Sequence, residues 1–217
     1  DSSTSRGLGD VYKRQDKIFS YTKETNMVNI TIFGKGNMGQ AIGGNFAETG
    51  NVVNYITTKT TKQDLGEIII FAVPYSAVSS IVELYKDELR GKTIIDITNP
   101  VNFETFDDLV VPSDSSAAGI ISTLLPESFV IKGFNTNFAN TLSTKNVGGE
   151  HPTTVLLAGD NEEAKEKVIK TLDGSNLNLL DVGSLKRARE LESLGFLQIS
   201  LAGSDKISWQ NGFGLFE

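Results

Sequence analysis

The 217-residue sequence contains no cysteine, a single histidine and only five prolines. Without cysteine it has no disulfide framework, iron–sulfur cluster or thiolate nucleophile, and this absence fits a reducing cytoplasm. The longest apolar run, Ile68–Val73, is far shorter than the roughly 18 residues that a membrane-spanning helix needs. We therefore expect a cytoplasmic protein that does not span a membrane and that would need a bound cofactor for any redox chemistry.

Acidic side chains outnumber basic ones by 27 to 20, which gives a formal net charge of −7. This excess disfavours binding to nucleic acid or to an anionic membrane surface, so a small molecule is the expected partner. The sequence has no H-E-x-x-H motif, no cluster of metal ligands and no Ser-His-Asp set, so it predicts no metal site and no catalytic residue. His151 is expected in a surface loop, and Asp96 has no evident partner.

The chain divides into three expected regions. Residues 1–26 are polar and show no periodicity, and we interpret them as a disordered or non-native leader. Residues 27–150 are expected to form the larger domain, which contains the dinucleotide-binding candidates. Residues 151–217 are expected to form a smaller C-terminal region, with a βαβ unit followed by a terminal helix.

Short apolar runs alternate with helical patterns from residue 27 onward, which predicts an α/β fold with a Rossmann-like, mostly parallel sheet and helices on both faces. Strands are predicted at 29–33, 52–56, 68–73, 93–97, 130–134, 153–157 and 177–180. Helices are predicted at 37–49, 75–89, 162–172 and 185–203. The eleven residues between Ile56 and Ile68 are too few for a helix and another strand, so a loop is expected there.

The terminal helix has apolar residues on two sides. Leu194, Leu197 and Leu201 recur with the spacing of one buried stripe, whereas Phe196 and Ile199 fall outside it. A helix with two apolar faces can meet a second subunit. The alternative is a helix that only folds against its own sheet.

The segment Gly34-Lys35-Gly36-Asn37-Met38-Gly39 forms a G-x-G-x-x-G motif between a predicted strand and a predicted helix. In dinucleotide-binding folds the first glycine permits a tight turn, the second lets the backbone approach a pyrophosphate, and the third allows close helix–strand packing. The amides of Asn37 and Met38 would donate to the phosphates at the helix N-terminus. The alternative is a tight turn that binds no ligand.

The end of the second strand selects the dinucleotide, because NAD enzymes carry an acidic residue there for the ribose 2′-hydroxyl. This chain instead has Thr57, Thr58 and Lys59, with Lys62 three residues later. Hydroxyl and ammonium donors suit a 2′-phosphate, so NADP is predicted over NAD. The alternative is a solvated polar loop that ignores the cofactor.

Two more predicted strand ends point to the same crevice, since ligands of open parallel sheets bind beyond the carboxyl ends of the strands. One is Val73-Pro74 and the other is Asn99-Pro100. Proline beside flat apolar surface can pack against a ribose or nicotinamide, and Asn99 could hydrogen-bond the cofactor. Either pair could equally be ordinary turn chemistry.

These segments together resemble a family, the NADPH-dependent oxidoreductases typified by the reductase of the deazaflavin F420. That family shares its fold with the cytosolic domain of six-transmembrane metalloreductases. The matching segments are 34–39, Phe71-Ala72-Val73-Pro74-Tyr75, Asp96-Ile97-Thr98-Asn99-Pro100, Val130-Ile131-Lys132-Gly133-Phe134-Asn135-Thr136, Ala158-Gly159-Asp160 and Ala188-Arg189-Glu190-Leu191-Glu192.

The resemblance implies hydride transfer between NADP(H) and F420, a flavin or a similar acceptor, and a C-terminal segment that helps form a homodimer. It implies pyrophosphate binding by the glycine loop and 2′-phosphate binding by residues 57–59. The nicotinamide would be bordered by Val73, Pro74, Asn99, Pro100 and Asn135. Two other interpretations stay open: a non-catalytic module that responds to NADP(H), and a small-substrate NADP dehydrogenase.

Two positions depart from the family pattern. Lys59 replaces an arginine that commonly binds the 2′-phosphate, and lysine offers a point charge without a bidentate fork. Asn135-Thr136 stands in place of the His-Thr-Ile-Pro pattern that the resemblance associates with deazaflavin reductases. The sequence therefore leaves the identity of the electron acceptor open.

Overall fold

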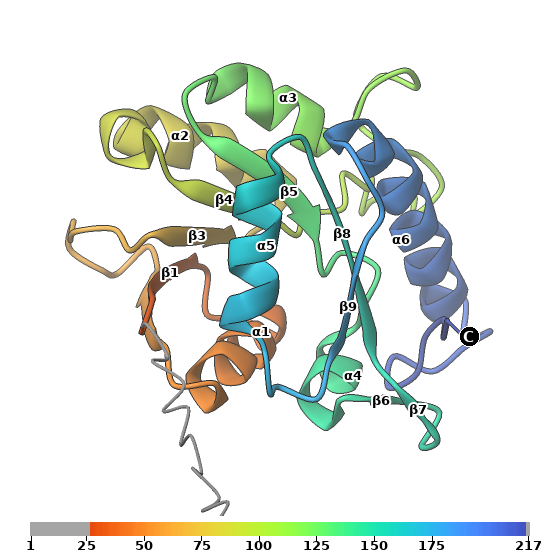
Figure 1. Cartoon of the computed structure of the whole chain (residues 1–217). Coiled ribbons are helices and arrows are strands. Elements are labelled where there is room, and N and C mark those ends of the chain that lie inside the picture. Colours follow the sequence, from red (N-terminus) through yellow and green to blue (C-terminus); the bar gives the residue numbers. More distant parts are fainter. Residues whose placement is uncertain (1–26, 216–217) are drawn as a thin grey trace, which may run out of the picture.

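The computed structural model describes residues 27–215, so the expected leader, residues 1–26, lies outside the described residues. Figure 1 shows a twisted central sheet with helices on both faces. The elements in chain order are β1 (Asn29–Phe33), α1 (Asn37–Glu48), β2 (Val52–Ile56), β3 (Ile68–Phe71), α2 (Tyr75–Leu89), β4 (Thr93–Asp96), α3 (Ala117–Leu124), β5 (Phe129–Gly133), α4 (Ala139–Thr144), β6 (Asn146–Val147), β7 (His151–Pro152), β8 (Thr154–Gly159), α5 (Glu162–Thr171), β9 (Asn178–Asp181), the 3₁₀ helix η1 (Leu185–Arg187) and α6 (Ala188–Gly203).

The main sheet has seven strands in the order β2-β1-β3-β4-β5-β8-β9. All neighbouring pairs are parallel except β5 and β8. The predicted Rossmann-like, mostly parallel α/β fold is therefore confirmed. The strands β8 and β9, from the expected C-terminal region, extend this same sheet, and β6 and β7 form a small separate hairpin.

Central strands are buried on both faces, which explains their unbroken apolar sequences. All four residues of β3 are 0% exposed. Ile68 and Ile70 face the core under α1, α4 and α5, whereas Ile69 and Phe71 face the core under α2 and α3. Because the strands β1 to β5 are parallel to their neighbours, their carboxyl ends lie at the same edge of the sheet.

The loop expected between β2 and β3 is present, and residues 57–67 contain neither helix nor strand. The predicted elements recur within a few residues of their observed bounds. Missing from the prediction were α3, α4 and the β6–β7 hairpin. These elements lie in the long stretches after β4 and β5, where the predicted pattern shows only loops.

The predicted buried stripe on the terminal helix is wrong. Leu197 is 51% exposed, and Leu194 and Leu201 are only half-buried. The helix α6 instead buries a stripe of small and polar residues together with Leu191, namely Ala188, Leu191, Glu192, Gly195, Gln198 and Ala202. Close packing on β8 and on the ends of β4 and β5 leaves room only for small side chains or for polar ones with partners.

Among the helices of residues 27–215, none has both the length and the apolar character that crossing a membrane would require.

Candidate functional site

The glycine loop leaves β1 in a conformation that only glycine tolerates at its first position. Gly34 has a φ of +101°, and a Cβ there would lie 2.1 Å from the carbonyl oxygen of Ala72. A Cβ on Gly39 would lie 2.3 Å from the carbonyl oxygen of Gly34. These two glycines therefore hold the turn against β3 and let α1 begin directly beneath it.

Gly36 has the opposite environment. A Cβ built on it meets no atom within 4 Å, so this glycine faces open space. The first α-helical hydrogen bond of α1 runs from the amide of Gln40 to the carbonyl of Gly36. The amides of Asn37, Met38 and Gly39 precede that bond, and the first turn has no acidic residue. Free amides at a helix N-terminus favour an anion such as phosphate.

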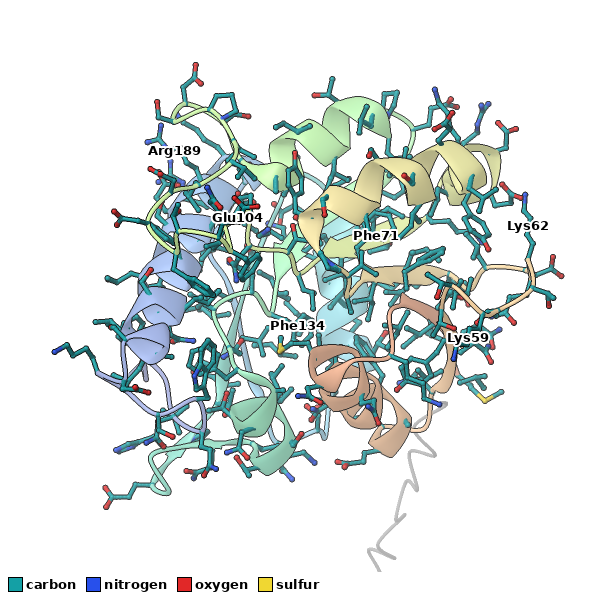
Figure 2. All side chains as sticks on the ribbon, turned by 180° about the vertical axis from the view of Figure 1, so that it is seen from behind. Lys59, Lys62, Phe71, Glu104, Phe134 and Arg189 are labelled. Carbon is teal, nitrogen blue, oxygen red and sulfur yellow. The ribbon has the colours of Figure 1, made fainter. Side chains whose placement is uncertain are left out.

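The loop after β2 forms the adjoining wall of the site, and Figure 2 shows Lys59 and Lys62 on it. The hydroxyls of Thr57 and Thr60 lie 3.0 Å apart, and Thr60 Oγ1 accepts from the amide of Thr57. This threonine turn leaves Thr58 and Lys59 exposed. Within the described residues, Lys59 forms no salt bridge.

Two further lysines flank this loop. Lys35 of the glycine loop lies over the Tyr55 ring, with its Nζ 5.1 Å from the ring centroid. Lys62 pairs with Glu88 and lies over Tyr85. From Gly34 to Lys62 the sequence has one acidic residue, Glu48, which pairs with Lys145. The segment is thus locally basic in an acidic protein.

The ends of β4 and β5 are joined through two asparagine side chains. The Nδ2 of Asn99 donates to the carbonyl of Asn135, and the Nδ2 of Asn135 donates to Asn99 Oδ1, both at 2.9 Å. Asn135 Nδ2 also donates to the carbonyl of Leu191 on α6. A Cβ on Gly195 would lie 2.4 Å from Asn99 Oδ1. The terminal helix therefore packs directly against both predicted site residues.

Two buried polar atoms at this edge lack a partner within residues 27–215. They are the Oδ1 of Asn135 and the Oγ1 of Thr98, on residues that are each 4% exposed. Phe134, just before Asn135, has a φ of +61° and is fully buried. Strained backbone and unsatisfied buried atoms are concentrated at ligand sites, so this edge has unused hydrogen-bonding capacity.

The end of β3 contributes the remaining predicted pair. Val73 is half-buried, and the exposed Pro74 is the N-cap of α2. Pro100, by contrast, is buried. Tyr75 is half-buried, and its pKa is raised by burial and by the nearby charges of Glu192 and Asp96. Its phenol thus stays a neutral hydrogen-bond donor at neutral pH.

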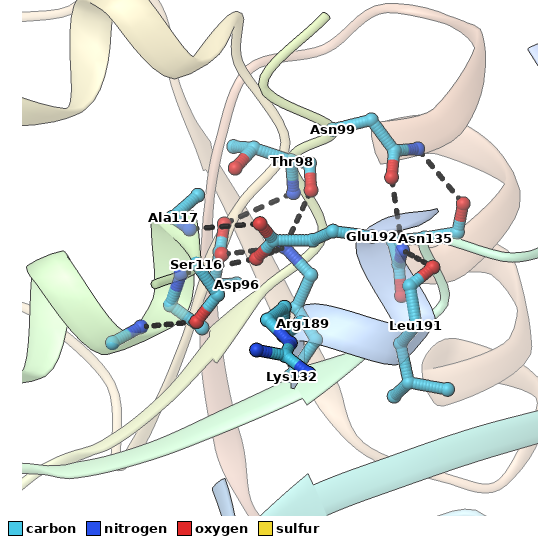
Figure 3. A network of polar contacts seen from close by, with 12 residues as sticks. Asp96, Thr98, Asn99, Ser116, Ala117, Lys132, Asn135, Arg189, Leu191 and Glu192 are labelled. Carbon is cyan, nitrogen blue, oxygen red and sulfur yellow. Dashed lines mark hydrogen bonds and ion pairs between the residues drawn. The ribbon is translucent and has the colours of Figure 1, made fainter. Parts of the chain in front are cut away.

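A buried ion network lies behind this edge, as Figure 3 shows. Lys132 Nζ is 2.8 Å from Asp96 Oδ2 and 2.8 Å from Glu192 Oε1, and it donates to the carbonyl of Thr98. The interpretation of Asp96 as a residue without a partner is therefore wrong. The three charged side chains are 0–1% exposed.

Glu192 also caps a helix. Its Oε2 accepts from the amide of Ala117 at 2.8 Å, and its Oε1 accepts from Ala118 at 3.2 Å. These are the first two residues of α3. Burial raises the pKa of Glu192, although Lys132 and the Ala117 amide favour its charged form. One carboxylate thus connects α6 to β5 and to the helix that ends the loop after β4.

His151 lies outside this site. It pairs with Val147 in the β6–β7 hairpin, and its side chain is 44% exposed. Within residues 27–215, no group of three or more histidine or acidic side chains is arranged to hold a metal ion.

The residues at this edge fit a nicotinamide dinucleotide phosphate. Among residues 27–215, the amides of Asn37, Met38 and Gly39 precede the first helical hydrogen bond beside the open space at Gly36, and the exposed Thr58 and Lys59 follow β2. Unsatisfied amide and hydroxyl oxygens stand at the ends of β4 and β5. In such a ligand these three groups would face the pyrophosphate, the 2′-phosphate and the nicotinamide, respectively.

No family model matches the sequence, but individual proteins and solved structures do. The chain is 30% identical over 142 residues to the F420-dependent NADP reductase of Methanocaldococcus jannaschii, covering 63% of this chain and 62% of that protein. It is 33% identical over 150 residues to the rat metalloreductase STEAP3, covering 69% of this chain and 28% of that protein. The chain thus spans less than two thirds of the curated relatives it matches.

Among solved structures, an Arthrobacter protein assigned as an F420-dependent NADP reductase superposes with a TM-score of 0.75 at 22% identity. The match covers 88% of this chain and 100% of that one. At this identity the likeness supports the fold alone. Together with the two sequence matches, it confirms the resemblance expected from the motif segments.

Proposed function

We propose that this chain is an NADPH-dependent oxidoreductase that transfers hydride between NADP(H) and F420, a flavin or a related acceptor. The observation that carries the proposal is the glycine loop, in which Gly34 and Gly39 are fixed by contact and Gly36 faces open space beside free amides. The sequence relatives are an F420-dependent NADP reductase and a metalloreductase, which supports redox chemistry with NADP(H).

NADP is favoured over NAD by the basic segment that contains Lys35, Lys59 and Lys62. A carboxylate at the end of β2 would repel a 2′-phosphate dianion, whereas Thr57 and Thr58 offer hydroxyl donors there. Lys59 has no internal counter-ion among the described residues, so its charge is available to a ligand. We place the 2′-phosphate at Thr57, Thr58 and Lys59.

In this proposal the protein binds the cofactor, orients its nicotinamide ring toward the acceptor and shields the two rings from water. Bound NADPH supplies a hydride, the C4 hydrogen with its two electrons, which the acceptor takes up together with one proton from solvent. Val73, Pro74, Asn99, Pro100 and Asn135 would border the nicotinamide. Because Asn99 and Asn135 are already bonded to each other, they form a preorganised polar wall beside the proposed position of the carboxamide. Alignment of the two rings then does most of the catalysis.

We further propose a homodimer through α6 and the edge strand β9. Leu180 and Leu197 are 44% and 51% exposed, and Leu194 packs at the margin of the small cluster around Leu156. Exposed apolar residues that adjoin a core cluster mark an interaction surface. A second copy paired along β9 would lie at the edge of the sheet opposite β2, with β3, β4, β5 and β8 between it and β1, so it would not block the glycine loop.

The experiment is a pair of measurements on the purified chain. Calorimetric titration with NADP⁺, NADPH and NAD⁺ should give tight binding of the phosphorylated forms and weak binding of NAD⁺. NADPH oxidation is then followed with F420, FMN, FAD and a ferric chelate, with NADH as the matched control. Acceleration by one acceptor supports the enzyme. Tight NADPH binding without acceleration by any acceptor refutes the enzyme and favours a binding module.

A further inference from the structure

The buried network behind the ends of β4 and β5 does not balance its charge. It holds two carboxylates, Asp96 and Glu192, and one ammonium, Lys132, all shielded from water. With all three ionised, one negative charge is in excess. The first-turn amides of α3 offset part of it, since a helix N-terminus is equivalent to about half a positive charge.

This network is bonded to the backbone that leads into the proposed nicotinamide site. Asp96 Oδ1 accepts from the amide of Thr98 at 2.9 Å, and Lys132 donates to the carbonyl of the same residue. Asn99 follows directly. The carbonyl of Leu191, next to Glu192 on α6, accepts from Asn135. The charged groups are therefore bonded to the backbone next to Asn99 and Asn135, and their own side chains are shielded from water.

Tyr75 indicates the sign of the field at this edge. Its pKa is raised by burial first, and then by the charges of Glu192 and Asp96, while Lys132 acts in the opposite direction. The two carboxylates each influence the phenol more than the ammonium does. These charges therefore act on a side chain adjacent to Pro74, at the edge where the nicotinamide is proposed to bind.

We propose that Glu192 is a positioning residue whose buried charge makes the site favour the oxidised over the reduced nicotinamide. This inference rests on the proposed function. The oxidised ring carries a positive charge and the reduced ring is neutral, so a fixed negative charge behind the site binds the oxidised form more tightly. Tighter binding of the oxidised form lowers the reduction potential of the bound couple and makes bound NADPH a stronger hydride donor.

The test is the ratio of two dissociation constants, Kd(NADP⁺)/Kd(NADPH), measured at pH 8 because burial raises the pKa of Glu192 and an alkaline pH favours its charged form. Glu192→Gln should raise this ratio by about three- to tenfold, as expected for one unit charge acting through a partly buried path. A tenfold change corresponds to about 30 mV for a two-electron couple. Glu190→Gln is the matched control, because Glu190 lies on the same helix but is 45% exposed, and it should leave the ratio unchanged.

A second variant separates charge from packing. Lys132→Met/Glu192→Gln removes one charge of each sign, so the excess negative charge remains on Asp96 and the ratio should return close to that of the wild type. If Glu192→Gln does not fold by circular dichroism, Asp96→Asn tests the same loss of charge. The proposal is overturned if single and double variants show the same ratio, or if both affinities change by one common factor.

Failure of the proposed function gives a different result. If the wild-type chain binds neither NADP⁺ nor NADPH, the dinucleotide site itself is refuted, and the inference falls with it. If the wild type binds both and Glu192→Gln binds both with an unchanged ratio, the proposed function stands and only the role of Glu192 is refuted.

Discussion

Replacing Gly36 by alanine should abolish cofactor binding while leaving the fold intact. The backbone at Gly36 has a φ of −74° and a ψ of −174°, a conformation that alanine adopts freely. Since an added Cβ meets no protein atom within 4 Å, it creates no clash. Alanine is a poorer N-cap than glycine, but it also restricts the unfolded chain, so the two effects nearly cancel. The free energy of unfolding should change by less than about 0.5 kcal/mol.

The same methyl group would occupy the space into which the pyrophosphate must fit. Displacing a phosphate from even one amide of Asn37 or Met38 removes a charge-assisted hydrogen bond, which is worth about 1.5–3 kcal/mol. The affinity for NADPH should therefore fall at least tenfold. Calorimetric titration measures the affinity, and urea denaturation measures the stability of the same preparation.

Two other glycines of the same segment serve as controls. Gly44→Ala also meets no atom within 4 Å, but it lies in the middle of α1, so it should stabilise the fold by up to about 1 kcal/mol and leave NADPH binding unchanged. Gly39→Ala would press on the carbonyl of Gly34 and should destabilise the fold by about 1–3 kcal/mol. If Gly36→Ala binds NADPH as tightly as Gly44→Ala, the assignment of the open space to a pyrophosphate is refuted.

Three further predictions follow from the same structure. Lys59→Glu should weaken NADP⁺ binding about tenfold or more, through charge reversal beside a phosphate, and leave NAD⁺ binding unaffected; an equal loss with Lys186→Glu, or none with Lys59→Glu, would contradict this. Leu197→Glu should convert a dimer into a monomer in light scattering with little change in melting temperature, and a wild-type monomer would refute the proposed dimer face. The pKa of Glu67 is lowered chiefly by its bond with Lys167, so this pair stabilises the fold above the ordinary carboxylate range, and the effect is lost as the pH falls through the lowered value. Lys167→Met should accordingly reduce the free energy of unfolding at pH 7 by about 0.5 kcal/mol, a value scaled to an exposed pair. That difference from wild type should disappear as the pH falls through the lowered pKa of Glu67, and a difference that persists in stronger acid would have another cause.

Much of the framework was predictable because its signals are local. The glycine motif lies between β1 and α1, and its spacing fixes where the strand ends and where the helix begins. The helix α2 begins directly after Pro74, as predicted. The alternating pattern also predicted the parallel sheet. By contrast, α3 is short, and its first turn is capped by Ser116 and by Glu192, which lies 75 positions beyond Ala117 in the chain. Only Ser116 is part of the local sequence, so the contribution of Glu192 to the start of α3 could not be predicted from it.

The buried stripe of α6 was mispredicted for a related reason. A hydrophobic pattern assigns leucines to the core and polar residues to solvent. In α6 the buried polar residues have partners on distant elements. Glu192 forms an ion pair with Lys132, and Gln198 donates a hydrogen bond to the carbonyl of Thr136. Gly195 permits the close approach that brings them there. The leucines are left at the margin, where a second subunit is the partner that we propose.

The buried ion network shows where a sequence signal existed and was not used. Asp96 and Lys132 each interrupt an otherwise apolar strand, which costs free energy unless the charge is paired. The two strands are neighbours in the sheet, and Asp96 stands directly opposite Lys132 in their register. The sequence alone could thus have predicted an ion pair between these two opposite charges, because they stand at equivalent positions of neighbouring predicted strands. Glu192 could not, because the packing of α6 on these strands depends on glycine contacts that no periodicity reveals. The contact of Glu192 with Lys132 behind the ends of β4 and β5 is therefore a property of the tertiary structure alone.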